Sequence, residues 1–253
     1  MARASTTERP CYEARVSDPR TLPRDDRLAV SEVFQSVQGE GASAGLPCVF
    51  LRLSHCNLRC GFCDTKYTWD FQHYRIEDEV HVEGLADVAR RVLAFEPERL
   101  VITGGEPLIQ AGALVKLLTV LPAALAVEVE TNGTFAPPAE LAARVTQWNV
   151  SPKLANSGEP LVRRVRPEAL AALLATGRAW LKLVIGTLAD ADEAEALLVT
   201  TAWPRERVLL MPLGSTRAEL VERAPLVKGE ALRRRVGYSP RLHVEQWDGE
   251  RGK

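Results

Sequence analysis

Residues 48–65 read CVFLRLSHCNLRCGFCDT and combine an apolar run with a loop that carries three cysteines. The apolar run, Cys48–Leu53, predicts a buried β-strand, because large apolar and β-branched residues fit a sheet. The loop holds Cys56, Cys60 and Cys63 in the spacing C-x3-C-x2-C. These three thiols therefore follow the C-terminal end of a strand.

Around this stretch, strand-like and helix-like segments alternate. Connections of ordinary length between them favour parallel strands with right-handed crossovers. The other expected strands are Leu28–Phe34, Leu100–Thr103, Leu125–Glu130, Trp148–Val150, Ala179–Ile185, Val208–Met211 and Arg241–Glu245. The expected helices are Gly84–Phe95, Ile109–Val120, Pro138–Arg144, Glu168–Ala175, Asp190–Thr200 and Thr216–Val236. About six β/α units predict an α/β fold, an open partial (β/α)6 TIM-type barrel with additions, because a full barrel has eight.

The chain divides into a tail and one domain. Residues 1–27 are rich in Arg, Pro, Thr and Asp without a period, which predicts a disordered N-terminal tail. Residues 28–253 contain no repeat and no linker, and 46% apolar content over the chain suits one large barrel domain.

Composition excludes several classes of protein. The net charge is −1 and no basic face is expected, so we expect no nucleic-acid partner. No window approaches the run of about 20 apolar residues that spans a membrane, and no signal segment begins the chain. The five cysteines, an odd number with three crowded together, favour a reducing compartment over a disulfide framework. We expect a cytoplasmic protein.

The polar loops of the domain all follow strands. Besides the cysteine loop, they are Thr103–Pro107, Glu130–Gly133 and Ser151–Lys153. In parallel β/α folds the ligand site lies at the C-terminal ends of the strands. Four segments are therefore expected to meet at one mouth.

The cysteine loop has two metal-binding interpretations, and a reactive thiol is a third and weaker one. Three thiolates can hold three irons of a [4Fe–4S] cluster and leave the fourth iron open to an outside ligand. Alternatively the thiolates bind zinc, with His55 or Cys48 as a fourth ligand. The spacing is unlike paired C-x2-C knuckles, and the adjacent His55 and Cys56 would converge poorly on one ion, so we favour the cluster.

Other residues at the mouth each have a chemical and a purely structural interpretation. Gly104 and Gly105 allow backbone to approach a ligand ammonium, with Glu106 adding charge, or simply form a turn. Glu130 and Asn132 contact hydroxyl groups of a ligand or close a strand. Lys153 binds a carboxylate or lies on the surface.

Four further residues bear on the substrate and on a second metal. Arg52, in an apolar strand, pairs either with a structural carboxylate or with a substrate acid. Gln38 and Glu40 suit the edge of a nitrogen heterocycle, or form a turn. Thr65 either contributes to a Mg2+ site, which needs few protein ligands, or caps a helix.

Together these residues resemble the 7-carboxy-7-deazaguanine synthase family of the radical S-adenosylmethionine (SAM) superfamily. The general signature is the cysteine loop with Gly-Gly-Glu-Pro at 104–107. The narrower signature is Gln38–Gly41, Gly45-x-Pro47-x-x-Phe50-x-Arg52-Leu53, Cys56-Asn57-Leu58 and Cys63-Asp64-Thr65-x-Tyr67-x-Trp69. The resemblance runs from about residue 28 to the end, and is weaker in the last third. His55 departs from it, since the family commonly has Gly there, and so does Met211, where Gln is usual.

The resemblance implies ligands for these residues. Cys56, Cys60 and Cys63 would ligate a [4Fe–4S] cluster whose open iron SAM chelates. The SAM site would contain Phe62, Asp64, Gly105, Glu130, Asn132, Ser151, Pro152 and Lys153. The substrate 6-carboxy-5,6,7,8-tetrahydropterin would contact Val37, Gln38, Gly39, Arg52 and Thr103, with Lys253 and, more weakly, His243 as candidates at the chain end. Thr65 would ligate Mg2+ bridged to the substrate.

The resemblance also implies a reaction and partners. Reductive cleavage of SAM would give a 5′-deoxyadenosyl radical that takes hydrogen from C6, after which the ring contracts, ammonia leaves and SAM is regenerated. The product would enter queuosine and related 7-deazapurine pathways. A flavodoxin- or ferredoxin-type electron donor and a homodimer are expected. The rival functions are a glycyl-radical activating enzyme and a non-catalytic zinc-binding module.

Overall fold

The structure is a computed structural model of the chain, and it describes residues 21–252. Residues 1–20 of the expected tail, and Lys253, lie outside the described residues. The first strand begins at Arg27, one residue before the expected start of order.

The described residues form one nine-stranded sheet with the order β3-β1-β2-β4-β5-β6-β7-β8-β9. Pairing is parallel from β2 to β9, whereas β1 pairs antiparallel with both β2 and β3. The strands at the two ends of this order do not pair with each other, so the barrel is open. The strands are β1 Arg27–Val37, β2 Pro47–Leu53, β3 His81–Gly84, β4 Arg99–Gly104, β5 Ala126–Thr131, β6 Gln147–Val150, β7 Ala179–Ile185, β8 Val208–Pro212 and β9 Gly237–Tyr238.

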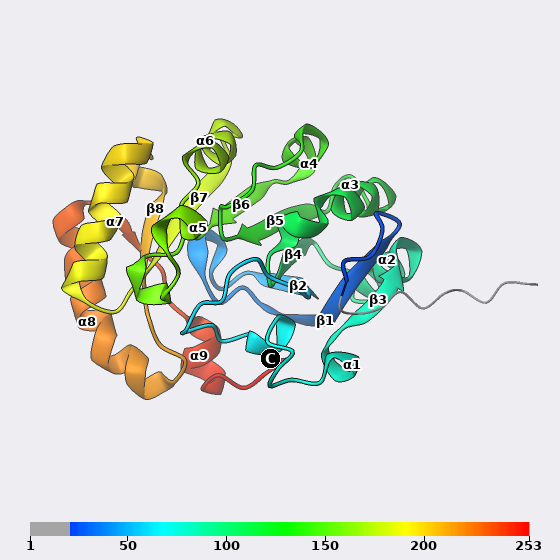
Figure 1. Ribbon diagram of the computed structural model, residues 1–253, viewed down its shortest axis with the longest axis horizontal. Coiled ribbons are helices and arrows are strands. Elements are labelled where there is room, and N and C mark those ends of the chain that lie inside the picture. The colour runs from blue at the N-terminus through cyan, green and yellow to red at the C-terminus, as the bar shows by residue number, and fades with distance from the viewer. Residues whose placement is uncertain (1–20, 253) are drawn as a thin grey trace, which may run out of the picture.

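Most of the helices form an arc outside the strands (Figure 1). Residues 54–75, α9 and the C-terminal residues lie on the side that this arc leaves uncovered. The α-helices are α1 Ile76–Glu79, α2 Leu85–Leu93, α3 Ala111–Val120, α4 Ala139–Arg144, α5 Leu161–Arg164, α6 Pro167–Ala175, α7 Leu188–Thr201, α8 Arg217–Arg234 and α9 Leu242–Trp247.

The two faces of the sheet differ in chemistry because side chains alternate along each strand. Val127 and Val129 of β5 belong to the hydrophobic core shared with the outer helices. Glu128 and Glu130 of the same strand therefore face the interior of the barrel. Lys182 of β7 faces inward by the same alternation, since Leu181 and Leu183 are core residues. The barrel thus presents a charged inner face to any ligand at its mouth.

The open partial barrel is confirmed, and so are its six successive β/α units from β2 to α8. Three local expectations are wrong. The first strand is antiparallel to its neighbour. The short strand β3 was not expected, because His81–Gly84 carries no run of apolar residues and depends on pairing with β1. Residues expected as a last strand, Arg241–Glu245, form the start of α9 instead.

Among residues 21–252, no helix is both long enough and apolar enough to cross a bilayer.

Candidate active site

The cysteine loop is held by the backbone of the next strand end. The amide of Gly105 donates to the carbonyl of Leu53 at 3.0 Å, and the amide of Glu106 donates to that of His55 at 2.8 Å. A Cβ built on Gly105 would lie 1.9 Å from the carbonyl oxygen of His55, and one on Gly104 would lie 2.0 Å from that of Leu53. Both positions therefore require glycine so that the loop can lie against β4.

His55 adopts a left-handed backbone conformation with a φ of 70°. Left-handed conformations favour glycine, which explains why Gly is usual here in the family that the sequence resembles. The imidazole packs edge-on against the ring of Phe71, with 5.4 Å between centroids. This contact offsets part of the cost of the backbone conformation.

The three thiols lie where a metal cluster can use them. Cys60 is buried, and Cys56 and Cys63 are half-buried. The sulfur of Cys63 accepts a hydrogen bond from the indole of Trp69 at 3.3 Å, and that of Cys56 accepts one from the amide of Leu58 at 3.5 Å. Hydrogen bonds to sulfur tune the potential of a bound iron–sulfur cluster.

Burial raises the pKa of the Cys56 thiol to about 12 and also raises the pKa of Cys60. Thiolates at these positions need a nearby positive charge to be stable, and a bound metal supplies it. The loop therefore suits metal ligation better than it suits a free reactive thiolate.

The arrangement of the described side chains does not favour the zinc interpretation. Within residues 21–252, no three His, Cys, Asp or Glu side chains are arranged to hold one metal ion. Cys48 packs with Phe50 and Val101 in a separate cluster, about 17 Å along β2 from the loop. In a cubane each thiolate binds its own iron, so the cluster interpretation does not require the three sulfurs to converge on one point.

Glu106 binds neighbouring strand ends together. Its side chain is fully buried and accepts hydrogen bonds from Leu108 N, from Thr131 Oγ1 at 2.8 Å and from Asn132 N at 2.7 Å. Burial raises the pKa of this carboxyl group. Because both oxygens are engaged within the protein, the expectation that Glu106 adds charge beside a ligand ammonium is not supported.

Asn132 ties the end of β5 to the cysteine loop. Its Nδ2 donates to Asn57 Oδ1 at 2.9 Å, and its Oδ1 accepts from Thr134 Oγ1 at 2.6 Å. Thr134 Oγ1 in turn accepts from Asn57 Nδ2 at 2.9 Å. The side chain of Asn132 thus positions the residue after Cys56.

Gln38, Thr103 and Glu130 meet on the inner face of the barrel. Glu130 accepts from Gln38 Nε2 at 3.0 Å through Oε1 and from Thr103 Oγ1 at 2.7 Å through Oε2. Gln38 lies after β1, so the loop that follows this strand enters the barrel. These three sequence-predicted residues therefore share one polar cluster.

Glu40, from the same loop, lies in a buried ion network. It pairs with Lys182, with Arg241 Nε at 2.8 Å and with His243 Nε2 at 3.7 Å. Burial tends to raise the pKa of Glu40, but the adjacent Lys182 and Arg241 outweigh it and hold the pKa well below its usual range. Glu40 therefore carries a negative charge within this buried network.

Arg241 links this network to the cysteine loop. Its Nη2 donates to Asp64, while its Nη1 donates to the carbonyl oxygen of Gly214. Burial tends to raise the pKa of Asp64, but Arg241 lowers it overall. The residue directly after Cys63 is thus fixed as a carboxylate.

Arg52 has the structural carboxylate that the sequence left as one alternative. Its Nε donates to Glu32 Oε2 at 2.8 Å, across the β1–β2 pair. Burial would lower the pKa of Arg52, but Tyr67 and Glu32 raise it. In the register of the sheet Arg52 lies opposite Thr103 of β4, beside the polar cluster of Glu130.

The remaining expected residues border the same mouth. Lys153 Nζ donates to Ser151 Oγ at 3.2 Å after β6, and Pro152 lies between them. Phe62 is half-buried within the cysteine loop. Val37 ends β1, and Gly39 has His243 so close that a Cβ would lie 2.1 Å from Nδ1. Lys253 lies outside the described residues.

The hydroxyl of Thr65 faces the sulfur of Cys63 rather than the helix that follows. It occupies the N-cap of the short 3-10 helix Lys66–Thr68, but its side chain makes no capping hydrogen bond. Its Oγ1 lies 3.6 Å from the sulfur of Cys63. The helix-capping alternative is therefore not realised by the side chain.

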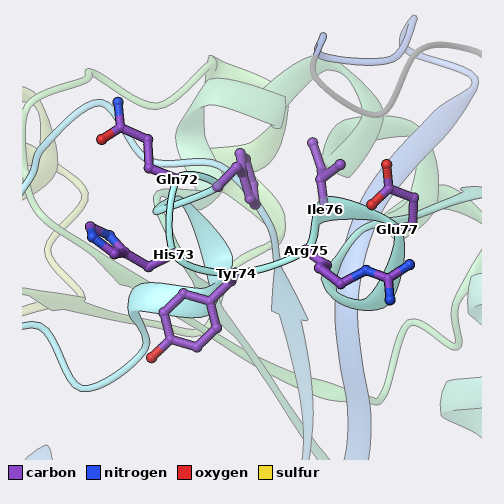
Figure 2. Close-up of a pocket in the computed structure, with 7 residues that line it drawn as sticks. Gln72, His73, Tyr74, Arg75, Ile76 and Glu77 are labelled. Carbon is purple, nitrogen blue, oxygen red and sulfur yellow. The ribbon is translucent and has the colours of Figure 1, made fainter.

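A hollow of about 380 Å³ lies on the loop 71–77, near the site but not at the strand ends. Figure 2 shows its labelled side chains, such as Gln72, His73 and Tyr74, fanning out in different directions rather than toward a common point. It lacks the converging polar groups of the barrel mouth and is not the candidate site.

Several charged residues of the site were missed in the sequence analysis. Glu32, Lys182, Arg241 and Arg251 all pair with residues far away in the chain. A charged residue in an apolar strand was a usable signal for Arg52, and Lys182 in β7 had the same signal. Arg241 and Arg251 stood in no recognisable pattern.

Comparisons with known proteins agree with this geometry. Residues 52–152 match the family model described as the Radical SAM superfamily. The 7-carboxy-7-deazaguanine synthase of Pyrobaculum aerophilum is 39% identical over 230 residues, covering 90% of this chain and 98% of that protein. That of Hyperthermus butylicus is 37% identical over 223 residues, covering 86% and 92%.

A solved structure is also similar. The crystal structure of QueE from Escherichia coli gives a TM-score of 0.64 at 26% identity, covering 86% of this chain and 95% of that chain. From these identities and coverages, the chain belongs to the 7-carboxy-7-deazaguanine synthase family of radical SAM enzymes.

Proposed function

We propose that this enzyme converts 6-carboxy-5,6,7,8-tetrahydropterin to 7-carboxy-7-deazaguanine with loss of ammonia, in 7-deazapurine biosynthesis. The main support for the proposal is that a metal-binding loop and a polar cluster lie side by side at the mouth of the barrel. The three-cysteine loop follows β2, and the polar cluster of Gln38, Thr103 and Glu130 lies on the inner face beside Arg52. A small, polar, acidic substrate fits these groups better than the protein substrate of an activating enzyme.

The cofactors are a [4Fe–4S] cluster and SAM, as in the superfamily. The donor set fits the cluster, since Cys56, Cys60 and Cys63 lie on one loop and two of their sulfurs accept hydrogen bonds. When bound, the two cofactors supply the radical that begins the rearrangement. The protein supplies orientation and keeps water away from the mouth.

SAM is proposed to lie across the ends of β4, β5 and β6. Gly105 is proposed to receive the SAM ammonium, and Lys153 to bind its carboxylate. Asn132 and Asp64 are proposed to act mainly by positioning the cysteine loop, because the side chain of Asn132 is already bonded to Asn57 and that of Asp64 to Arg241. Their hydrogen bonds hold the cysteine loop against the strand ends. The other proposed SAM contacts are Phe62, Glu130, Ser151 and Pro152.

The substrate is proposed to lie deeper, over the inner face. The guanidinium of Arg52 would bind its carboxylate through the two Nη groups, since within residues 21–252 only Nε is bonded to protein. Gln38 and Thr103 would contact the pterin edge, and both donate to Glu130, which lies between the two proposed sites. Val37 and Gly39 border the same space, and Lys253 stays a candidate.

Four finer assignments complete the proposal. Thr65 is proposed as a Mg2+ ligand, supported by a hydroxyl not used in capping. A flavodoxin- or ferredoxin-type protein is proposed to reduce the cluster. The enzyme is proposed to act as a homodimer and in the cytoplasm.

The proposal is tested by anaerobic reconstitution with iron and sulfide, followed by an assay with the carboxy-tetrahydropterin, SAM, Mg2+ and a reductant. We expect a brown protein that forms 7-carboxy-7-deazaguanine, and an Arg52→Ala variant whose KM for the pterin is raised about tenfold or more. A colourless, iron-free protein would contradict the cluster. A brown protein that cleaves SAM but leaves the pterin unchanged would contradict the substrate assignment.

A further inference from the structure

Arg251 fastens the C-terminal segment to the substrate side of the barrel. Its Nη1 and Nη2 donate to the two carboxylate oxygens of Glu79 at 3.1 and 2.7 Å, and its Nε donates to Glu32 Oε1 at 2.5 Å. Its guanidinium carbon lies 3.8 Å from the centroid of the Tyr67 ring. Arg251 therefore anchors the C-terminal segment, residues 248–252, although it lies only four residues past Trp247, the last residue of α9.

Glu32 is shared between Arg251 and Arg52. One oxygen accepts from Arg251, while the other accepts from Arg52 Nε at 2.8 Å and from the Tyr67 hydroxyl at 2.9 Å. Burial tends to raise the pKa of Glu32, but the hydrogen bond from Arg251 and the charge of Arg52 lower it overall. Glu32 is therefore an ionised acceptor that determines how Arg52 lies.

Because Glu32 is shared between two arginines, it determines which nitrogen atoms of Arg52 remain available to a ligand. A carboxylate with both oxygens free favours a two-pronged pair with a guanidinium. Because Arg251 occupies Oε1 of Glu32, Arg52 is bonded through Nε alone, and its two Nη groups make no hydrogen bond to protein within residues 21–252. Without Arg251, Glu32 is free to draw Arg52 into a two-pronged pair and away from a ligand.

We propose that Arg251 is a positioning residue for substrate recognition, which holds Glu32 so that Arg52 presents its Nη groups to the carboxylate of the substrate. The proposal rests on the proposed function, because it concerns how that substrate acid is bound. Arg251 does not touch the substrate in this account. Its effect passes through Glu32 to Arg52.

Substitution of Arg251 separates this role from a purely structural one. The Arg251 side chain is 43% exposed and Glu32 keeps Arg52 as a partner, but Glu79 is largely buried, so Arg251→Ala is expected to fold with a Tm lowered by a few degrees. The KM for the pterin should rise about tenfold, which corresponds to about 1.4 kcal/mol, while kcat stays within about twofold. Arg251→Lys, which keeps the charge but not the fork, should recover part of the loss.

Arg205 provides a matched control. It also holds a glutamate, Glu195, through two Nη groups, and its side chain is 42% exposed, but the pair lies on the outer helices. Arg205→Ala should leave the KM for the pterin unchanged. Equilibrium binding of the pterin without reductant should show the same weakening for Arg251→Ala, independently of turnover.

A substrate analogue completes the test. A tetrahydropterin in which hydrogen replaces the carboxylate should bind equally weakly to the wild-type and Arg251→Ala proteins, because the group that Arg52 recognises is missing. Unchanged pterin affinity in Arg251→Ala, or an equal loss with the analogue, overturns the role of Arg251 while turnover by the wild type upholds the proposed function. A wild-type protein that neither binds nor converts the pterin contradicts both.

Discussion

Gly105 is the residue whose lack of a side chain lets the cysteine loop lie against β4. A Cβ there would lie 1.9 Å from the carbonyl oxygen of His55, closer than any nonbonded contact allows. Gly105→Ala should therefore destabilise the protein by about 3 kcal/mol and strongly reduce iron loading. Thermal unfolding and iron content after reconstitution measure both effects.

Gly229 in α8 is the control for that substitution. A Cβ on Gly229 would meet no atom within 4 Å, and Ala is favoured over Gly inside a helix. Gly229→Ala should keep full iron loading and gain about 0.5–1 kcal/mol. Normal iron loading in Gly105→Ala would show that the loop does not depend on this close approach.

Thr65 supports a second prediction at the residue scale. Its hydroxyl makes no capping bond, so removing it should cost little stability. Thr65→Ala should lower activity about tenfold or more and abolish its dependence on added Mg2+, while Thr65→Ser should retain both. The measurement is the reaction rate of each variant as a function of Mg2+ concentration. A wild-type dependence on Mg2+ in Thr65→Ala would contradict the proposal that Thr65 is a Mg2+ ligand.

Single residues were predictable from the sequence where the chemistry is local. The cysteine spacing and the paired glycines each carry their meaning within a few residues. The partner of Arg52 was not predictable, because Glu32 comes next to Arg52 only through the antiparallel pairing of β1 and β2. Arg241 and Arg251 were missed for the same reason, since their carboxylate partners lie more than 170 positions earlier.

At the scale of elements, the N-terminus of α8 makes a measurable pH dependence. Thr216 and Glu219 form a capping box, and Glu219 Oε2 also accepts from Ser215 N at 2.8 Å. These backbone hydrogen bonds, led by that from Ser215, lower the pKa of Glu219 to about 2. Because the folded pKa is below the unfolded one, this stabilisation is complete above about pH 4.5 and is lost as the pH falls toward 2.

Glu219→Gln should therefore lower the Tm by about 1–2 °C at neutral pH and by progressively less as the pH falls from about 4.5 toward 2. Glu222→Gln, on the same helix but outside the capping box, is the control. Thermal unfolding across this pH range measures the difference. A Tm difference that stays constant down to about pH 2 would contradict the assignment.

Elements were predictable where a segment buries its own apolar pattern. The strand Ala179–Ile185 and the helices on the outer arc are examples. The structure of Arg241–Glu245 was not predictable, because the apolar residues Leu242 and Val244 alternate with polar ones as they would in a strand. The helix α9 forms there instead as the amide of Leu242 bonds to Gly39 and Arg241 is fixed by Glu40. Those tertiary contacts have no local signature.

For the whole molecule, the open barrel places opposite chemistries on the two faces of one sheet. The outer face packs against helices, and the inner face carries Glu128, Glu130 and Lys182. The C-terminal segment closes the uncovered side, where Arg241 joins Asp64 and Arg251 joins Glu79. The loop after β1, the cysteine loop and residues 241–252 thus lie together on this side of the barrel.

In the proposed function, radical generation at the cysteine loop is coupled to rearrangement of a pterin beside it. The most direct measurement is the ratio of 7-carboxy-7-deazaguanine formed to 5′-deoxyadenosine released, in the anaerobically reconstituted wild type. Because SAM is regenerated in the proposed reaction, we predict many molecules of product for each 5′-deoxyadenosine. Accumulation of 5′-deoxyadenosine without the deazaguanine product would contradict the account.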